Sequence, residues 1–436
     1  MGTRRRFAAL CALAVGARLS APAADDRSQL PQRPTFTTLS ITSLAIEGLT
    51  GDLAGNLYTA GRAPVPRGAA AGPPCPVWRI DARGTPLVTP TQIGSVPNPA
   101  PGCNLSGIAL DREGNLYVAD ANQGGVIWRL TPGDMNPTAP FATGVPGTNG
   151  LAFDPDGNLW TGDATTGQGR VWRIRPSGGA CQPSFTGCDE VFRVQPLANV
   201  LGAGLGGGVS NVGRDVRTLP PGAVDAARAA RDTAGSQPLV ANGLAFDGHG
   251  DLVIADTARG AIWKVEFDRH GRLASPTGCD STFTPNTLCL ENVLVAHPLL
   301  EGADGIALDA AGNIWVDANE RNAVVVVTSE GRVVEVFRNP VDAATGLRNA
   351  NPTVGNSHIL EFPTSPLLGG STLCTANSDG DRRDNSPRAA GEINAGGPVG
   401  ARGKISCMDQ RLVSPGLPLP SARGSARAPS PRRDGP

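Results

Sequence analysis

A short sequence unit occurs five times in the chain and restricts the fold more than any other feature. Each copy contains an apolar strand, a turn of the form Asp-x-x-Gly-Asn or Asp-x-x-Gly-Asp, and a second apolar strand. Glycine takes the positive φ that closes such a hairpin. Because one unit cannot bury its own apolar face, the copies must pack against one another. The five turns span residues 52–56, 111–115, 154–158, 247–251 and 309–313.

Each copy continues beyond its turn in the same way. The second strand is clearest at residues 115–120, 158–163 and 251–256, and a fourth strand occurs, for example, at 191–194 and 333–337. These segments are short, β-branched and aromatic, as strands should be. Four antiparallel strands at a spacing of roughly 40–60 residues describe a blade of a β-propeller. The third strands lie at residues 77–80, 127–130, 171–174, 262–265 and 324–327.

A sixth, degenerate copy fits residues 357–409, with strands at 359–362, 371–376 and 403–407. Residues 36–41 can supply the outer strand of this last blade and so close the ring. We therefore predict an all-β fold, a six-bladed β-propeller with four-stranded antiparallel blades, over residues 35–413.

Two stretches fall outside the repeat. Residues 196–239 form a Gly-rich insertion between the third and fourth copies, and loops of this length are usually functional or disordered. A lid is one interpretation of this insertion. The tail, residues 414–436, is rich in Pro, Arg and Ser and is predicted to be disordered.

The N-terminus has the pattern of an export signal over residues 1–24. Three arginines at positions 4–6 precede an apolar run at 7–16, and small residues at 21–23 offer a cleavage site. Ordinary secretion is favoured, and a twin-arginine signal is the alternative. The apolar run is too short to span a membrane, and no later segment approaches twenty apolar residues. We expect a secreted or periplasmic protein without a membrane partner.

Removal of the signal leaves eight cysteines, an even number that suits disulfides in an oxidising compartment. Zinc is the competing interpretation, but the chain has no Cys-x-x-Cys pair and its four histidines are scattered. Neighbours along the chain make the natural disulfide pairs, which are Cys75–Cys103, Cys181–Cys188, Cys279–Cys289 and Cys374–Cys407.

The charge of the chain is nearly balanced. The formal net charge is −1, and no basic patch with interleaved aromatic residues occurs. Nucleic acid is therefore not expected as a partner. We expect a monomer that acts on a small molecule.

A polar residue stands just before the first strand of each copy. Because the first strand of each blade lines the central channel of a propeller, these residues should form a ring near one mouth. Carboxylate and amide oxygens suit Ca²⁺ or a similar divalent cation, which would satisfy groups that are costly to bury unpaired. Asn-Gly and Asp-Gly are also common turn dipeptides, although Glu47 would be an odd turn residue. The ring comprises Glu47, Ser106, Asn149, Asn242 and Asp304.

These positions carry a resemblance to a known family over about residues 45–380, closest at 303–316. The family is that of senescence marker protein, gluconolactonase and luciferin-regenerating enzyme, six-bladed propellers that hydrolyse lactones or related esters with one divalent cation in the channel. The motifs similar to its four metal-ligand motifs are Glu47-Gly48, Asn149-Gly150, Asn242-Gly243-Leu244 and Asp304-Gly305-Ile306.

The resemblance implies roles for the ring residues. Glu47, Asn242 and Asp304 would be direct ligands, and Asn149 a ligand or a substrate contact. Asp304 would also act as the catalytic base, and Ser106 is a further candidate substrate contact. Sugar-lactone members carry an arginine two residues before the Asn149 position, where this chain has Gly147. That departure disfavours a sugar acid lactone and leaves a less polar ester or lactone open.

The leading hypothesis is therefore metal-assisted hydrolysis, an enzymatic activity on an ester bond. The cation would polarise the carbonyl and lower the pKa of its water, while a carboxylate moves the proton. The alternative is a non-catalytic secreted propeller of the NHL type that serves as a binding or scaffold module. A lyase-type propeller is disfavoured because no histidine occupies a ring position. The fold alone cannot decide between these functions.

Overall fold

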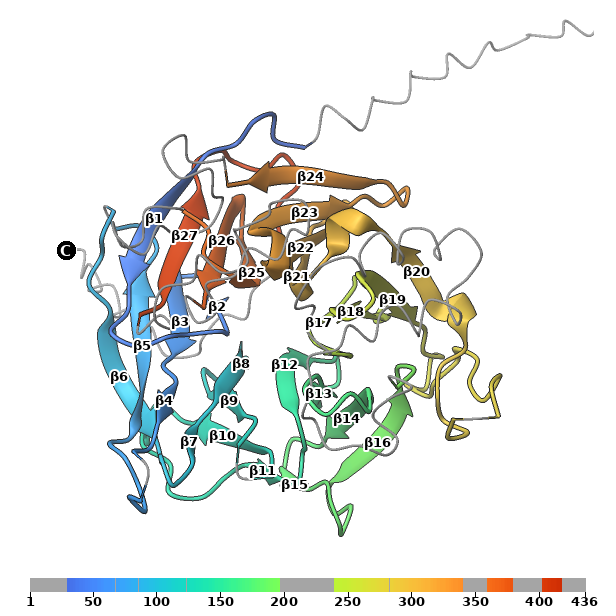
Figure 1. Cartoon of the computed structure of the whole chain (residues 1–436), viewed down its shortest axis with the longest axis horizontal. Coiled ribbons are helices and arrows are strands. Elements are labelled where there is room, and N and C mark those ends of the chain that lie inside the picture. The colour runs from blue at the N-terminus through green and yellow to red at the C-terminus, as the bar shows by residue number, and fades with distance from the viewer. Residues whose placement is uncertain are drawn as a thin grey trace, which may run out of the picture.

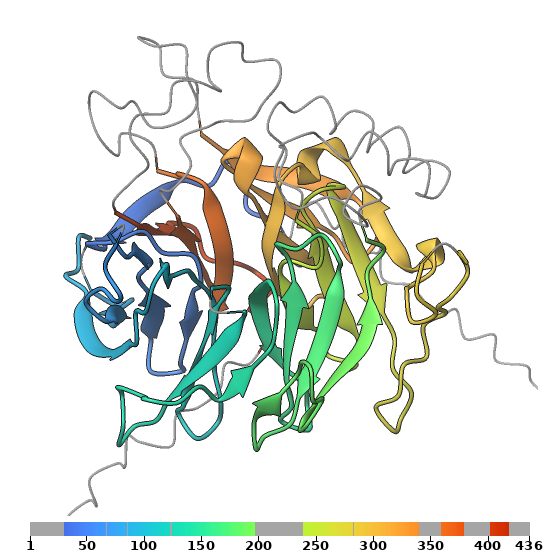
Figure 2. The same cartoon turned by 60° about the horizontal axis from the view of Figure 1, so that its bottom comes forward.

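The structure is a computed structural model that describes residues 30–196, 239–339, 359–378 and 402–417, apart from residues 67, 85, 123 and 282. The predicted signal peptide, the interior of the predicted insertion and residues 418–436 lie outside this description. Six antiparallel sheets surround a central channel, with one strand of each sheet innermost (Figure 1). Figure 2 shows the strands of neighbouring blades standing side by side around this channel. The predicted six-bladed β-propeller is confirmed.

The first three blades follow one another along the chain, and in each the strands are ordered from the channel outward. Blade 1 contains β2 (Thr50–Gly51), β3 (Asn56–Ala60), β5 (Cys75–Asp81) and β6 (Thr91–Val96). Blade 2 contains β8 (Leu105–Leu110), β9 (Leu116–Asp120), β10 (Val126–Leu130) and β11 (Ala142–Thr143), and β15 (Gly179–Ala180) adds to its outer edge. Blade 3 contains β12 (Thr148–Phe153), β13 (Leu159–Asp163), β14 (Arg170–Ile174) and β16 (Cys188–Arg193).

The other three blades complete the ring. Blade 4 contains β17 (Leu244–Phe246), β18 (Leu252–Asp256), β19 (Ala261–Val265) and β20 (Val293–Ala296). Blade 5 contains β21 (Ala303–Leu308), β22 (Ile314–Ala318), β23 (Ala323–Val327) and β24 (Val333–Arg338). Blade 6 contains β25 (Pro363–Gly369), β26 (Thr372–Asn377), β27 (Lys404–Met408) and β1 (Phe36–Ile41). A small ribbon pairs β4 (Ala63–Pro64) with β7 (Gly102–Cys103), and short 3₁₀ turns are η3 (Leu290–Asn292), η4 (Pro298–Leu300) and η5 (Asn319–Arg321).

The hydrogen bonds of the repeated turn explain its sequence. Asp309 accepts bonds at Oδ1 from the backbone N–H groups of Ala311 (2.9 Å) and Asn313 (3.0 Å). Its Oδ2 accepts from the Asn313 side chain (2.8 Å) and from Trp315 Nε1 (3.1 Å). One carboxylate therefore closes the turn and fixes a large buried ring on the second strand, which is why Asp and Asn recur at the two ends of the turn.

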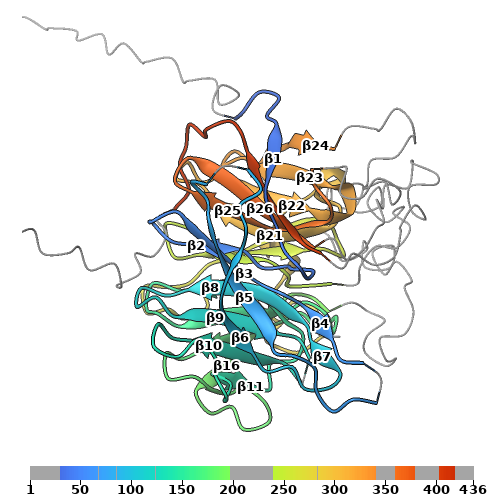
Figure 3. The same ribbon diagram turned by 90° about the vertical axis from the view of Figure 1, so that its left-hand side faces the viewer.

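Blade 6 joins the two ends of the propeller. β1 pairs with β27 from Phe36↔Met408 to Ile41↔Lys404, so the first strand that the structure describes is the outer strand of the last blade (Figures 1 and 3). The predicted inner strand at residues 359–362 is wrong, because the strand is β25, which begins at Pro363. The inner edge of β25 has no partner strand, so it tolerates Pro363 and Pro366, which gave the segment a turn-like sequence.

The core lies between the blades. Trp160 of blade 3 and Trp263 of blade 4 belong to one apolar cluster, and Trp315 of blade 5 shares another with Met408 of blade 6. Each blade thus buries its faces against its neighbours, as the repeat requires. The ordered chain continues past the predicted boundary at residue 413, since the backbone of Leu417 donates a hydrogen bond to Leu308.

The four predicted disulfides are present, Cys75–Cys103, Cys181–Cys188, Cys279–Cys289 and Cys374–Cys407. The last joins β26 to β27 within blade 6, where the two cysteines lie opposite each other. Within the described ranges, no helix is both long and apolar enough to cross a membrane.

Candidate functional site

The predicted ring residues occupy equivalent places at the start of the inner strands. A glycine follows each of the five and packs on the backbone of the next ring residue. A Cβ atom would not fit at any of these contacts, so each blade meets the next through backbone atoms alone. A Cβ on Gly48, Gly107, Gly150, Gly243 or Gly305 would lie 2.3, 2.1, 2.4, 2.3 or 2.3 Å from the carbonyl oxygen of Ser106, Asn149, Asn242, Asp304 or Thr364, respectively.

These contacts identify the sixth member of the ring, which the sequence did not reveal. Gly305 packs on Thr364, and the Thr364 hydroxyl donates a hydrogen bond of 2.8 Å to the backbone carbonyl of Glu47. The ring is therefore closed. None of its five glycines has a positive φ, so close approach rather than a turn requires them. The interpretation of the Asn-Gly and Asp-Gly pairs as turn dipeptides is thereby excluded.

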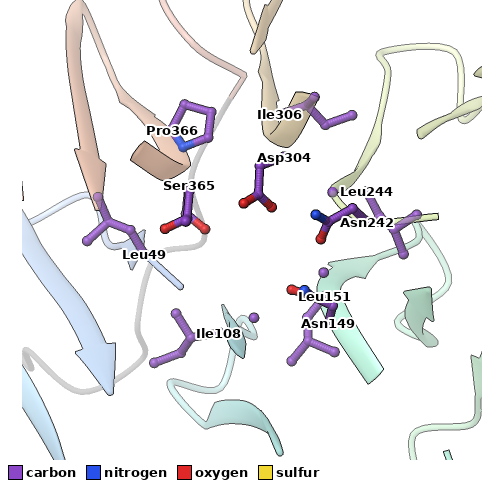
Figure 4. Close-up of a pocket in the computed structure, with 15 residues that line it drawn as sticks. Leu49, Ile108, Asn149, Leu151, Asn242, Leu244, Asp304, Ile306, Ser365 and Pro366 are labelled. Carbon is purple, nitrogen blue, oxygen red and sulfur yellow. The ribbon is translucent and has the colours of Figure 1, made fainter. Parts of the chain in front are cut away.

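Three ring side chains converge on one pocket in the channel. Asn149, Asn242 and Asp304 line a cavity of about 70 Å³, and Figure 4 shows their polar groups directed into it. A space of this size holds a few water molecules or one small ligand. Glu47 and Ser106 are not among the residues that line it. The structure thus brings together three of the four predicted ligands, and their role as ligands stays a prediction.

A second set of residues lies fifteen positions after the ring. In blade 5, Asn319 donates a hydrogen bond of 2.7 Å from Nδ2 to Asp304 Oδ2. In blade 4, Asn242 Nδ2 donates to Thr257 Oγ1 at 3.0 Å, and Thr257 donates in turn to the carbonyl of Ala303 at 2.6 Å. Such partners fix the orientation of the groups they hold. The set comprises Arg62, Ala121, Ala164, Thr257 and Asn319.

The ring side chains therefore differ in whether a polar residue fifteen positions later holds them. Blades 2 and 3 have alanine at this position, and within the described residues no hydrogen bond reaches the Asn149 side chain. Ser106 instead donates from Oγ to the carbonyl of Thr148 at 3.1 Å. The ring residues with a polar residue fifteen positions later are Glu47, Asn242 and Asp304, the three that the family resemblance implies as direct ligands.

The orientation of Asn242 leaves a buried oxygen without a partner. Because Nδ2 is bound to Thr257, Oδ1 is the free atom, and it makes no hydrogen bond although the residue is only 1% exposed. A buried acceptor left unsatisfied is destabilising, so such a group calls for an explanation. An amide oxygen beside the Asp304 carboxylate and a second amide at Asn149 is a donor set that fits a hard divalent cation. The described residues contain no cluster of three or more His, Cys, Asp or Glu side chains suited to a metal, because amides supply much of this ring.

Glu47 has a cationic partner from the protein itself. Its carboxylate forms an ion pair with Arg62, whose Nε also donates to the carbonyl of Leu105 at 2.8 Å. Burial lowers the pKa of Arg62 to about 10, and the nearby charge of Asp304 opposes this shift. Sequence reasoning missed Arg62, although the constant spacing of fifteen residues from ring to partner was a usable signal.

Asp304 sits in an environment that favours its protonated form. Burial raises the pKa of Asp304 to about 7, while the hydrogen bond from Asn319, the charge of Arg62 and the hydrogen bond from Asn242 lower it. Burial also raises the pKa of Asp317 well above its usual range; its hydrogen bond with Thr375 lowers that pKa and the charge of Asp304 raises it further. A carboxyl group poised near neutrality in a cavity is a typical catalytic acid or base.

The position of the missing family arginine has no room for a side chain. Gly147 has φ = +68°, and a Cβ there would lie 2.1 Å from Asp163 Oδ1. Asp163 is itself held by Arg170, with Nε and Oδ2 3.1 Å apart. The surrounding structure therefore accepts glycine at this position and not a larger side chain.

Comparisons with known proteins agree with the resemblance. A family model described as the SMP-30/gluconolactonase/LRE-like region matches residues 224–348, which include Asn242, Thr257, Asp304 and Asn319. This part of the chain is similar to that family region. The predicted resemblance is thus confirmed. No curated protein matches the chain.

Several solved structures are similar to this one. A putative gluconolactonase is 15% identical with a TM-score of 0.49, over 91% of this chain and 98% of that one. A luciferin-regenerating enzyme is 14% identical with a TM-score of 0.49, over 89% and 99%. The calcium-binding protein regucalcin from Agrobacterium tumefaciens is 15% identical with a TM-score of 0.47, over 89% and 99%.

Proposed function

We propose that the protein is a metal-dependent hydrolase that cleaves a lactone or related ester in the channel pocket, with Ca²⁺ as the cation. The observation that supports this most is the convergence of Asn149, Asn242 and Asp304 on one cavity, with the Asn242 oxygen buried and unpartnered. Such a set is costly to maintain without a ligand. Asp304, Asn242 and Asn149 would hold the ion, and Glu47 would join them on leaving Arg62.

The side chains of this site have separable tasks. The cation, when bound, supplies Lewis-acid polarisation of the scissile carbonyl. Thr257 holds the Asn242 amide so that its oxygen faces the pocket, and Asn319 holds the Asp304 carboxylate through Oδ2. Oδ1 of Asp304 is then the atom that takes the proton of the attacking water.

The reaction balances as a hydrolysis. The water oxygen bonds to the carbonyl carbon, the acyl carbon–oxygen bond breaks, and the proton held by Asp304 passes to the departing alkoxide. The products are a carboxylic acid and an alcohol, which remain one molecule when the substrate is a lactone. No further reactant is needed.

The four disulfides support an oxidising location. Such bonds persist in secreted and periplasmic proteins and are rare in the cytosol. We infer that the protein is secreted or periplasmic and acts there as a monomer.

The experiment that tests the proposal combines calorimetric Ca²⁺ titration with assays on a panel of lactones and aryl esters. Asp304→Asn should abolish Ca²⁺ binding and lower kcat/KM at least ~100-fold, because a ligand and the base are lost together. The matched control is Asp268→Asn, in an exposed turn where Asp268 pairs with Arg272, and it should change neither value. Hydrolysis that survives both chelation and Asp304→Asn would refute the mechanism.

One observation favours the alternative of a non-catalytic NHL-type binding propeller. The Glu47 carboxylate is neutralised by Arg62 and does not line the pocket. A ring balanced in this way can persist without a metal. Purified protein that binds no Ca²⁺ and hydrolyses no member of the panel would support a binding module.

A further inference from the structure

A second set of side chains lines the pocket together with the polar residues. Two positions after each ring residue, every blade places an apolar side chain. We name these six residues the collar. All of them line the pocket, and Figure 4 shows them around its wall. The collar comprises Leu49, Ile108, Leu151, Leu244, Ile306 and Pro366.

The collar shares the pocket with the polar ring. Asn149, Asn242 and Asp304 line the same cavity as all six collar residues, so both sets face the channel. A molecule bound in the pocket therefore meets polar groups and apolar side chains together.

The collar offers little to a hydroxylated ligand. Apart from the three convergent residues, the polar side chains that line the pocket are Thr364 and Ser365, and the Thr364 hydroxyl is bound to the carbonyl of Glu47. The cavity lining contains no lysine or arginine, and Asp163 occupies the space beside Gly147 where a substrate-holding cation would project. Each hydroxyl buried without a partner weakens binding by roughly 5- to 150-fold, whereas each buried methylene strengthens it roughly fourfold.

We propose that the substrate is a lactone or ester whose acyl part is a short hydrocarbon without hydroxyl groups, bound with its carbonyl at the polar ring and its hydrocarbon in the collar. This inference rests on the proposed function. The same six side chains disfavour polyhydroxylated sugar lactones, because their hydroxyl groups would be desolvated without partners.

The test compares two substrates with the same ring size on the wild-type, Ca²⁺-loaded protein. The expected kcat/KM for δ-valerolactone is at least ~100-fold higher than for glucono-δ-lactone. Alkyl substituents on the δ carbon should raise kcat/KM by roughly fourfold per methylene until the collar is full. The Asp304→Asn variant identifies the part of each rate that belongs to this site.

A variant of the collar makes the test specific. Ile108→Asn should lower kcat/KM for δ-valerolactone at least ~10-fold and leave the low value for glucono-δ-lactone unchanged or raised. Ile108→Val, which removes one methylene, should lower the first value about fourfold and keep the core intact. The control is Leu294→Asn, at a side chain that is 45% exposed on β20.

The outcomes separate the two proposals. Asp304-dependent hydrolysis that is equal or faster with glucono-δ-lactone would overturn the collar inference and leave the hydrolase intact. Hydrolysis of neither lactone nor any ester would overturn both.

Discussion

The contact between Gly243 and Asp304 offers a sharp test of the ring geometry. A methyl group at Gly243 would lie 2.3 Å from the Asp304 carbonyl oxygen, 2.8 Å from Gly305 Cα and 3.0 Å from the Ile306 nitrogen. All three are backbone atoms, so no side-chain rotation can relieve the contact. An ordinary contact of this kind needs at least 3.4 Å, so Gly243→Ala must move blade 5 away from blade 4 by about 1 Å.

The expected cost follows from two effects. Overpacking of a rigid contact destabilises by about 1–3 kcal/mol. The hydrogen bond that Gly243 N–H donates to the Asp304 carbonyl, 3.1 Å long, is lost and adds about 0.5–1.5 kcal/mol. We therefore expect Gly243→Ala to lower the free energy of unfolding by about 2–4 kcal/mol.

The assay is urea denaturation with the disulfides intact, followed by tryptophan fluorescence. The matched control is Gly248→Ala in the same blade, where a Cβ meets nothing within 4 Å and φ is not positive. The midpoint should fall for Gly243→Ala and stay constant for Gly248→Ala, because only the first methyl group separates two blades. Equal midpoints for the two variants would show that the blades do not meet in this way.

Three further predictions address other parts of the molecule. Lys404→Met should lower the free energy of unfolding by about 3–5 kcal/mol in urea denaturation, because Glu361, whose side chain is 2% exposed, loses its cation. The double variant Lys404→Met, Glu361→Leu should recover most of this loss. Burial raises the pKa of Asp163 to about 6, so the folded protein binds this proton more tightly than the unfolded chain does. The resulting contribution to stability is complete below about pH 4 and is lost as the pH rises through about 6. Wild type should therefore lose up to about 3 kcal/mol relative to Asp163→Asn between about pH 4 and pH 7, and a difference that is constant with pH would contradict this assignment. Replacing both Cys374 and Cys407 by alanine should lower the free energy of unfolding by about 2–4 kcal/mol in the same assay. The other three disulfides must stay oxidised in that measurement, so that the loss belongs to this bond alone.

Much of the fold could be predicted because the repeat combines two independent signals. The Asp-x-x-Gly turn marks the hairpin, and the β-branched runs around it mark the strands. Blade 6 shows where this reasoning fails. It lacks the turn, and Pro363 and Pro366 hide an inner strand whose channel edge needs no N–H donors. The correct strand depended on tertiary context that no local propensity contains.

The site, like the fold, could be predicted in part from the sequence. Asn149, Asn242 and Asp304 meet as expected because equivalent strand positions must face one channel. The pairing of Glu47 with Arg62 was not foreseen, because a charge partner depends on cross-strand position and not on local sequence. Five copies with identical loop lengths nevertheless place each partner fifteen residues after its ring residue, so the spacing could have revealed it.

The union of β1 with β27 has a consequence for biogenesis. The outer strand of blade 6 is made long before its partner edge, which appears only when residues 404–408 have been synthesised. Until then residues 36–41 are an exposed edge that invites wrong pairing. Removing residues 36–41 or residues 404–408 would open the ring at the same place. Both segments are therefore needed to close the propeller.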